Sequence, residues 1–179
     1  PSNIKKSHLA KFMAECRRGD SDYYSFWRWT VENSEDFWSQ FWDYADIIGD
    51  KGNVILNQPD KMTGAQFFTD GEINYAENCL KNKSEKPAII FEGERGNKKK
   101  LSFNELYEQV SLWAQALKKH GIQQGDRVAA LMPNLPETII AYLATASIGA
   151  IWSSASPDFG VQGIIDRFDQ IKPKILITV

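Results

Sequence analysis

The sequence predicts an α/β fold in which parallel strands alternate with helices, preceded by a helical segment rich in aromatic residues. Short apolar runs bounded by turn residues recur after residue 86, and helical stripes separate them. Strands buried on both faces are typical of parallel sheets, whose strands are joined by right-handed crossovers. Residues 23–44 also hold nearly half of the aromatic side chains. We therefore expect a helical cap followed by a parallel βαβ layer.

The aromatic segment predicts at least one amphipathic helix. Ser34 with Glu35 and Asp36 is a favourable helix start. Aromatic side chains then follow at three- and four-residue spacing: Phe37, Trp38, Phe41, Trp42 and Tyr44. Such rings could stack on single-stranded nucleic acid, but the acidic residues around them would repel phosphates. We interpret this face as a packing surface.

Residues 50–70 contain Gly, Asn, Pro and Asp with isolated apolar residues, which predicts a covering loop. Asn74 is expected to cap a short helix that continues through Leu80. A polar linker at 82–86 then places a domain boundary near Lys86. The sequence therefore predicts two parts, residues 1–85 and residues 86–179.

The second part is predicted to begin with a hairpin and a long helix. Residues 88–91 form an apolar strand, 93–97 a turn, and a second short strand lies near Lys100. Ser102 and Glu105 have the spacing of a capping box. A helical apolar stripe then continues until Gly121.

The parallel layer is predicted from residue 128 onward. Strands are expected at 128–131, 150–153 and 175–179, with a helix from about Pro136 to Ser147 between the first two. Ser156 is expected to cap the next helix, with Pro157 at its first position and its end near Gln170. Because no helix follows the last strand, we expect a truncated piece of a larger enzyme.

Composition limits the possible partners and compartments. The net charge is -2, from 21 basic and 23 acidic residues, which gives no global field for nucleic acid or an anionic membrane. Cys16 and Cys79 lack neighbours at ligand spacing, which favours a reducing, cytosolic setting without zinc. The start lacks a signal core, and the uncharged stretch at 138–157 is too broken to span a membrane.

Several common catalytic motifs are missing from the sequence. The turn after Leu131 lacks the glycines of a dinucleotide site, and no Walker loop is present. A serine nucleophile needs an adjacent base, but His8 lies in the N-terminal tail and His120 is expected at a helix end. The acidic residues that could suggest a metal site are expected in solvated or capping roles: Asp158, Asp166 and Asp169.

The small polar residues at 153–158 follow a predicted buried strand. In open parallel sheets, ligands bind beyond the carboxyl ends of the strands, where small side chains leave space. A tight turn chosen only for its capping residues explains the same pattern equally well. Spacing alone leaves both interpretations open.

Four stretches resemble the N-terminal part of the AMP-forming acyl-CoA synthetases. "YYSFWRWTVENSEDFWSQFWDY" (23–44) and "FFTDGEINYAENCL" (67–80) resemble the cap of the branch that acts on short acids. "LSFNELYEQV" (101–110) and "GAIWSSASPDFG" (149–160) are similar to two regions of the adenylation domain. Phe67 stands where family members often carry Trp. The resemblance covers nearly the whole chain.

The resemblance implies a ligase that uses ATP and Mg²⁺ to form an acyl-adenylate, with acetoacetate as the expected acid, and then transfers the acyl group to coenzyme A. It also implies that the ATP loop, the later adenylate motifs and a mobile C-terminal domain lie beyond residue 179. We therefore expect no catalytic or metal residues here and no activity from this chain alone. The residues expected on the coenzyme A side are Ser154, Ser156, Asp158 and Gly160. The alternatives are a related ligase for another short acid and a freestanding α/β interaction module.

Overall fold

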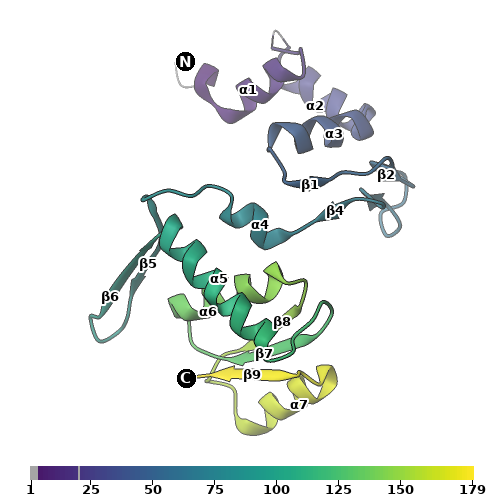
Figure 1. The fold of residues 1–179 in the computed structure, drawn as a ribbon. Coiled ribbons are helices and arrows are strands. Elements are labelled where there is room, and N and C mark those ends of the chain that lie inside the picture. Colours follow the sequence, from purple (N-terminus) through teal and green to yellow (C-terminus); the bar gives the residue numbers. More distant parts are fainter. Residues whose placement is uncertain (1–3, 20) are drawn as a thin grey trace. The chain divides into compact units, whose positions relative to one another are not determined.

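The computed structural model describes residues 4–19 and 21–179, which form two compact units, Pro1–Ile73 and Asn74–Val179 (Figure 1). The predicted division into residues 1–85 and 86–179 stays a prediction about domain organisation. Within the described residues, no helix is both long and apolar enough to cross a membrane.

The first unit begins with a short 3-10 turn, η1 (Ile4–Lys6), and three helices, α1 (His8–Glu15), α2 (Tyr23–Glu32) and α3 (Ser34–Tyr44). The Ser7 side chain caps α1, and the Asp22 carboxylate caps α2. Together the helices enclose a small core of buried side chains: Phe12, Met13, Cys16, Phe26 and Trp29. The predicted helical aromatic cluster is thus confirmed.

The Phe12 ring is the centre of this cluster. Its centroid lies between 4.9 and 5.9 Å from those of four other aromatic rings: Phe26, Phe37, Phe41 and Tyr44. All but Tyr44 meet it in edge-to-face geometry. Helix α1, which supplies this ring, was not predicted. Helix α3 begins at Ser34 as predicted, but the Ser34 hydroxyl donates back to the Val31 carbonyl at 2.8 Å and does not cap the helix.

Residues 46–73 form four two-residue strands where the sequence predicted only a covering loop. They are β1 (Gly49–Asp50), β2 (Leu56–Asn57), β3 (Gln66–Phe67) and β4 (Glu72–Ile73). Strand β1 pairs with β4 and β2 with β3, both antiparallel. With so few ladder bonds, side-chain contacts hold this segment to α3.

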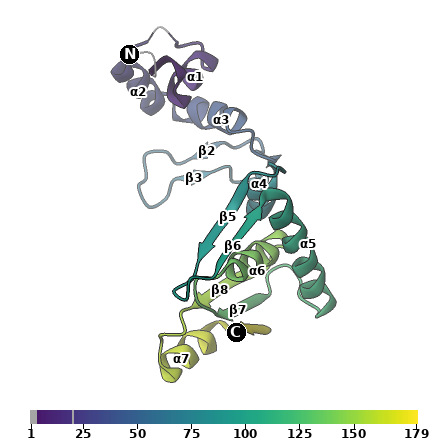
Figure 2. The same ribbon diagram turned by 90° about the vertical axis from the view of Figure 1, so that its left-hand side faces the viewer.

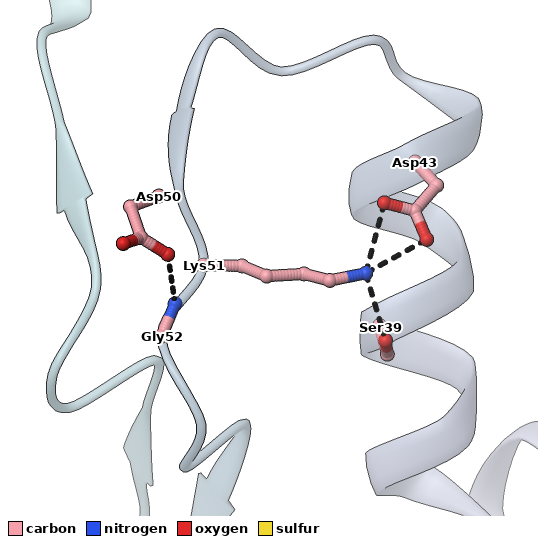
Figure 3. A network of polar contacts seen from close by, with 5 residues as sticks. All are labelled: Ser39, Asp43, Asp50, Lys51 and Gly52. Atoms are coloured by element: carbon pink, nitrogen blue, oxygen red, sulfur yellow. Dashed lines mark hydrogen bonds and ion pairs between the residues drawn. The ribbon is translucent and has the colours of Figure 1, made fainter.

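Lys51 supplies the main polar contact between this segment and α3 (Figure 3). Its ammonium group donates to both Asp43 carboxylate oxygens, at 2.7 and 2.9 Å, and to the Ser39 hydroxyl at 3.2 Å. Apolar contact comes from two ring pairs, Trp42 with Phe68 at 4.8 Å and Trp38 with Phe67 at 5.3 Å.

The second unit begins with α4 (Tyr75–Leu80), the antiparallel hairpin of β5 (Pro87–Glu92) and β6 (Lys98–Ser102), and the long helix α5 (Phe103–Lys119). The capping box of Ser102 and Glu105 forms as predicted. Asn74 caps α4 through its side-chain oxygen, again as predicted. Its amide nitrogen also donates to the carbonyl oxygens of Ala146 and Ser147, both at 3.2 Å.

The parallel layer follows as β7 (Arg127–Leu131), α6 (Pro136–Ser147), β8 (Ile151–Ala155), α7 (Val161–Ile171) and β9 (Ile175–Thr178). The strand order is β8-β7-β9, with both pairs parallel as predicted. Helices α5 and α6 pack on one face of the sheet, and α7 packs on the other (Figures 1 and 2). Central strand β7 carries three fully buried residues, Val128, Ala129 and Ala130.

Candidate functional site: the carboxyl edge of the parallel sheet

The three parallel strands end at one edge, at Leu131, Ala155 and Thr178. The chain leaves β7 to form β8 on one side and then crosses to form β9 on the other. Open α/β sheets bind ligands beyond the carboxyl ends of their strands, where the strand order reverses. The candidate site therefore comprises the loops that follow β7 and β8.

The predicted serines lie partly inside the strand and partly beyond it. This strand was predicted to end at Ser153, whereas β8 continues to Ala155. Ser153 and Ser154 therefore pair with Ala129 and Ala130 of β7. Serine is tolerated there because β8 borders the sheet. Ser154 is exposed on the sheet face that carries Trp152.

The predicted helix start at Ser156 and Pro157 is wrong. Residues 156–159 form a turn in which the Phe159 amide donates to the Ser156 carbonyl at 3.2 Å. The Ser156 hydroxyl donates to the Asp158 carboxylate at 2.8 Å and accepts from the Asp158 amide at 3.3 Å. Ser156 and Asp158 thus bond to each other, so Asp158 lies before the helix and not in its first turn.

Helix α7 instead begins after Gly160, which stands at the cap position without a side-chain cap. A β-carbon added at Gly160 or Gly163 would meet no atom within 4 Å, so the space around this helix start is open. The Phe159 ring lies 4.4 Å from the Arg167 guanidinium carbon. Backbone N–H groups at such a start have no intrahelical partner.

The loop after β7 adjoins this turn. The Met132 amide donates to the Ala155 carbonyl at 3.3 Å, and the Thr138 hydroxyl donates to the Pro133 carbonyl at 2.7 Å. In the first turn of α6, Glu137 accepts a 2.6 Å hydrogen bond from Lys99 of β6. That bond is the main cause that lowers the pKa of Glu137.

A row of aromatic side chains beside β8 was not predicted. Tyr75 of α4 lies 5.8 Å from Tyr142 of α6, which lies 6.1 Å from Trp152 of β8. Hydrogen bonding to Cys79, and secondarily to Tyr142, raises the pKa of Tyr75 to about 12. These residues come from three distant segments, so no local pattern could have shown their proximity.

The arrangement suits binding more than bond-breaking. His120 ends α5 and precedes β7, so it lies toward the amino edge of the sheet, away from the serines. Among residues 4–19 and 21–179 no group of three His, Cys, Asp or Glu side chains could hold a metal ion. Asp166, considered as a ligand, accepts instead from Gln162 one helical turn away. Loops with small side chains and an open helix start can line a ligand.

Comparison with solved structures supports the fold assignment. The acetoacetyl-CoA synthetase of Streptomyces lividans superposes with a TM-score of 0.86 at 30% sequence identity, over 99% of this chain and 29% of that protein. The acetoacetyl-coenzyme A synthetase of Rhizobium meliloti is 46% identical over 98% of this chain. The acetoacetyl-CoA synthetase of Gallus gallus is 37% identical over all of it. The chain spans only 28% of the length of these two relatives.

Two family profiles match in sequence. The profile described as acetyl-coenzyme A synthetase N-terminus matches residues 23–79, which include the aromatic helices α2 and α3. The AMP-binding enzyme profile matches residues 76–179, which include the parallel sheet and both loops of the candidate site. The chain therefore belongs to the AMP-binding enzyme family.

Proposed function

We propose that this chain is the N-terminal portion of an ATP-dependent, AMP-forming ligase that joins acetoacetate to coenzyme A through an acyl-adenylate. The 46% identity to the Rhizobium meliloti acetoacetyl-coenzyme A synthetase, over almost the whole chain, is the observation that carries this proposal. The fold agrees with it, because the AMP-binding region forms an open parallel sheet with its loops at the carboxyl edge.

In this reaction the acetoacetate carboxylate attacks the α-phosphorus of ATP and pyrophosphate leaves. The coenzyme A thiol then attacks the acyl carbon and AMP leaves. Among the described residues no group of three His, Cys, Asp or Glu side chains could hold the magnesium ion expected with ATP without further ligands. The groups that bind the metal and activate the phosphate are proposed to lie in other parts of the enzyme, with a mobile C-terminal domain. The site of action is proposed to be the cytosol.

The role proposed for this chain is to shape one side of the coenzyme A channel. The side chains and backbone that would line it are Ser154, Ser156, Asp158 and Gly160. Ser154 is exposed, and the bonded pair of Ser156 and Asp158 keeps the turn compact. The Asp158 carboxylate would repel the phosphates of coenzyme A, so the pantetheine arm is the part expected to pass this turn.

The test uses the full-length protein and two separate readouts. Acetoacetate should support ATP–pyrophosphate exchange, which needs no coenzyme A, whereas the 179-residue chain alone should support none. Ser154→Trp should fill the channel and raise the KM for coenzyme A about tenfold while exchange continues. Gln115→Trp, on the exposed face of α5, is the matched control. Loss of exchange with unchanged coenzyme A dependence would show that this turn serves adenylation or folding instead.

A further inference from the structure

A groove in the first unit has the chemistry of an anion site. It lies where the turn after α1 meets α2, and its volume is about 400 Å³. Ligand pockets of small molecules start at roughly 300 Å³. Its lining combines cationic, aromatic and hydrogen-bonding side chains: Arg18, Tyr24, Ser25, Arg28, Trp29, Glu32 and Asn33.

The two arginines have guanidinium groups available to a ligand. Arg18 lies over the Trp29 ring, with its guanidinium carbon 4.5 Å from the ring centroid, and forms no ion pair with any described residue. Arg28 is exposed and has no hydrogen bond or ion pair to the described part of the chain. Each guanidinium has five N–H donors in a planar fork that matches phosphate oxygens.

The residues that line the groove carry one more positive than negative charge. Among the described lining residues Glu32 is the one acidic side chain, against two arginines. Asp22 is not among them, and its carboxylate accepts from the backbone amides of Tyr24 and Ser25 and from the Ser25 hydroxyl. Two guanidinium groups opposite one carboxylate favour a ligand that carries negative charge.

The aromatic residues of the lining, Tyr24 and Trp29, favour a ligand that also carries a ring. Trp29 is buried beneath Arg18, so its ring serves the core and fixes that arginine. Tyr24 is 75% exposed and borders the groove, and its ring lies 5.5 Å from the Tyr23 ring in edge-to-face geometry. A planar ring can stack on an exposed tyrosine while its charged group reaches the arginines.

We propose that this groove binds a ring-bearing phosphate monoester, with its phosphate held by Arg18 and Arg28 and its ring stacked on Tyr24. This site lies entirely within the first unit and is independent of the ligase activity proposed above. Stacking on nucleic acid was weighed for the aromatic residues of this segment and packing was predicted instead, and the buried Trp29 agrees with packing.

The test is isothermal titration calorimetry of the 179-residue chain with AMP, adenosine and inorganic phosphate as probes. AMP should bind saturably, with at least about tenfold higher affinity than adenosine, because a charge-assisted pair is lost with the phosphate. Arg28→Gln should weaken AMP binding about tenfold or more. Tyr24→Ala should weaken AMP binding without changing the affinity for inorganic phosphate. Arg95→Gln, in the exposed β5–β6 turn, removes the same charge elsewhere and should change nothing.

Circular dichroism should give the same helical signal for each variant, because Arg28 and Tyr24 are exposed. Equal affinity for AMP and inorganic phosphate would overturn the assignment of a ring-bearing ligand. An AMP affinity that falls in Ser154→Trp and not in Arg28→Gln would place the binding on the sheet and overturn the groove. Absence of AMP binding would overturn it as well, while acetoacetate-dependent exchange by the full-length protein would be unaffected.

Discussion

Replacing Asn74 should destabilise the second unit, because one side chain joins two helices. Its oxygen accepts from the Glu77 amide at the start of α4, and its nitrogen donates to the last carbonyl groups of α6, at Ala146 and Ser147. Loss of a helix cap costs about 1 kcal/mol. Each neutral hydrogen bond contributes about 0.5–1.5 kcal/mol. Asn74→Ala should therefore lower the free energy of unfolding by about 2–4 kcal/mol.

A second variant separates the two roles. Asn74→Ser keeps an oxygen that can cap α4 but is too short to reach the carbonyl groups of α6. Its cost should be smaller than that of Asn74→Ala by about the value of the cap, about 1 kcal/mol. Urea unfolding followed by circular dichroism measures both, with m-values expected to stay constant.

Asn57→Ala, at an exposed pair with Gln66 in the first unit, is the control and should change stability by less than about 0.5 kcal/mol. If Asn74→Ala matches this control, the link between α4 and α6 is not energetically important and the reasoning is refuted. Equal losses for the Ala and Ser variants would instead refute the contribution of the cap.

Two further predictions concern the core and the dependence on pH. Phe26 is 4% exposed, so Phe26→Ala should lower the free energy of unfolding by about 3–5 kcal/mol, measured by thermal or urea unfolding. Trp38 is half-buried, so Trp38→Ala should lower it by less. The reverse order would contradict the observed core. A hydrogen bond from Lys174, followed by one from the Gln123 amide, lowers the pKa of Asp126. Its stabilisation is therefore present above the unfolded pKa of about 4 and is lost as pH falls through the lower folded pKa. As the pH falls below about 4, Asp126→Asn should lose less stability than the wild type. A urea midpoint with the same pH profile in both proteins would argue against this pair.

The fold was largely predictable because its signals are local. The capping box at Ser102 and Glu105, the cap at Asn74 and the apolar runs of β7 and β9 each depend on residues within a few positions. Helix α1 was missed because its apolar residues Phe12 and Met13 gain their partners only from α2 and α3. The strands at 49–73 were missed because two-residue pairings leave no periodic pattern.

The candidate site was less predictable for the same physical reason. The pair Ser156-Pro157 has the local chemistry of a helix start, but the hydrogen bonds between Ser156 and Asp158 stabilise a separate turn, which delays the helix to Val161. The strand was predicted to end at Ser153, whereas β8 continues through Ser154 to Ala155. Serines are tolerated in β8 because, among the described residues, this strand pairs on one side only, with β7.

The strand order β8-β7-β9 has a consequence for biosynthesis. The central strand leaves the ribosome first, and its second partner comes much later, because β9 begins only at Ile175, after β8 and α7. At about 5–20 residues per second, β7 would wait on the order of several seconds for β9. During that interval the apolar faces of Val128 and Ala129 have no finished sheet around them. Transiently exposed apolar surface promotes aggregation, so protection during translation would matter most for this strand.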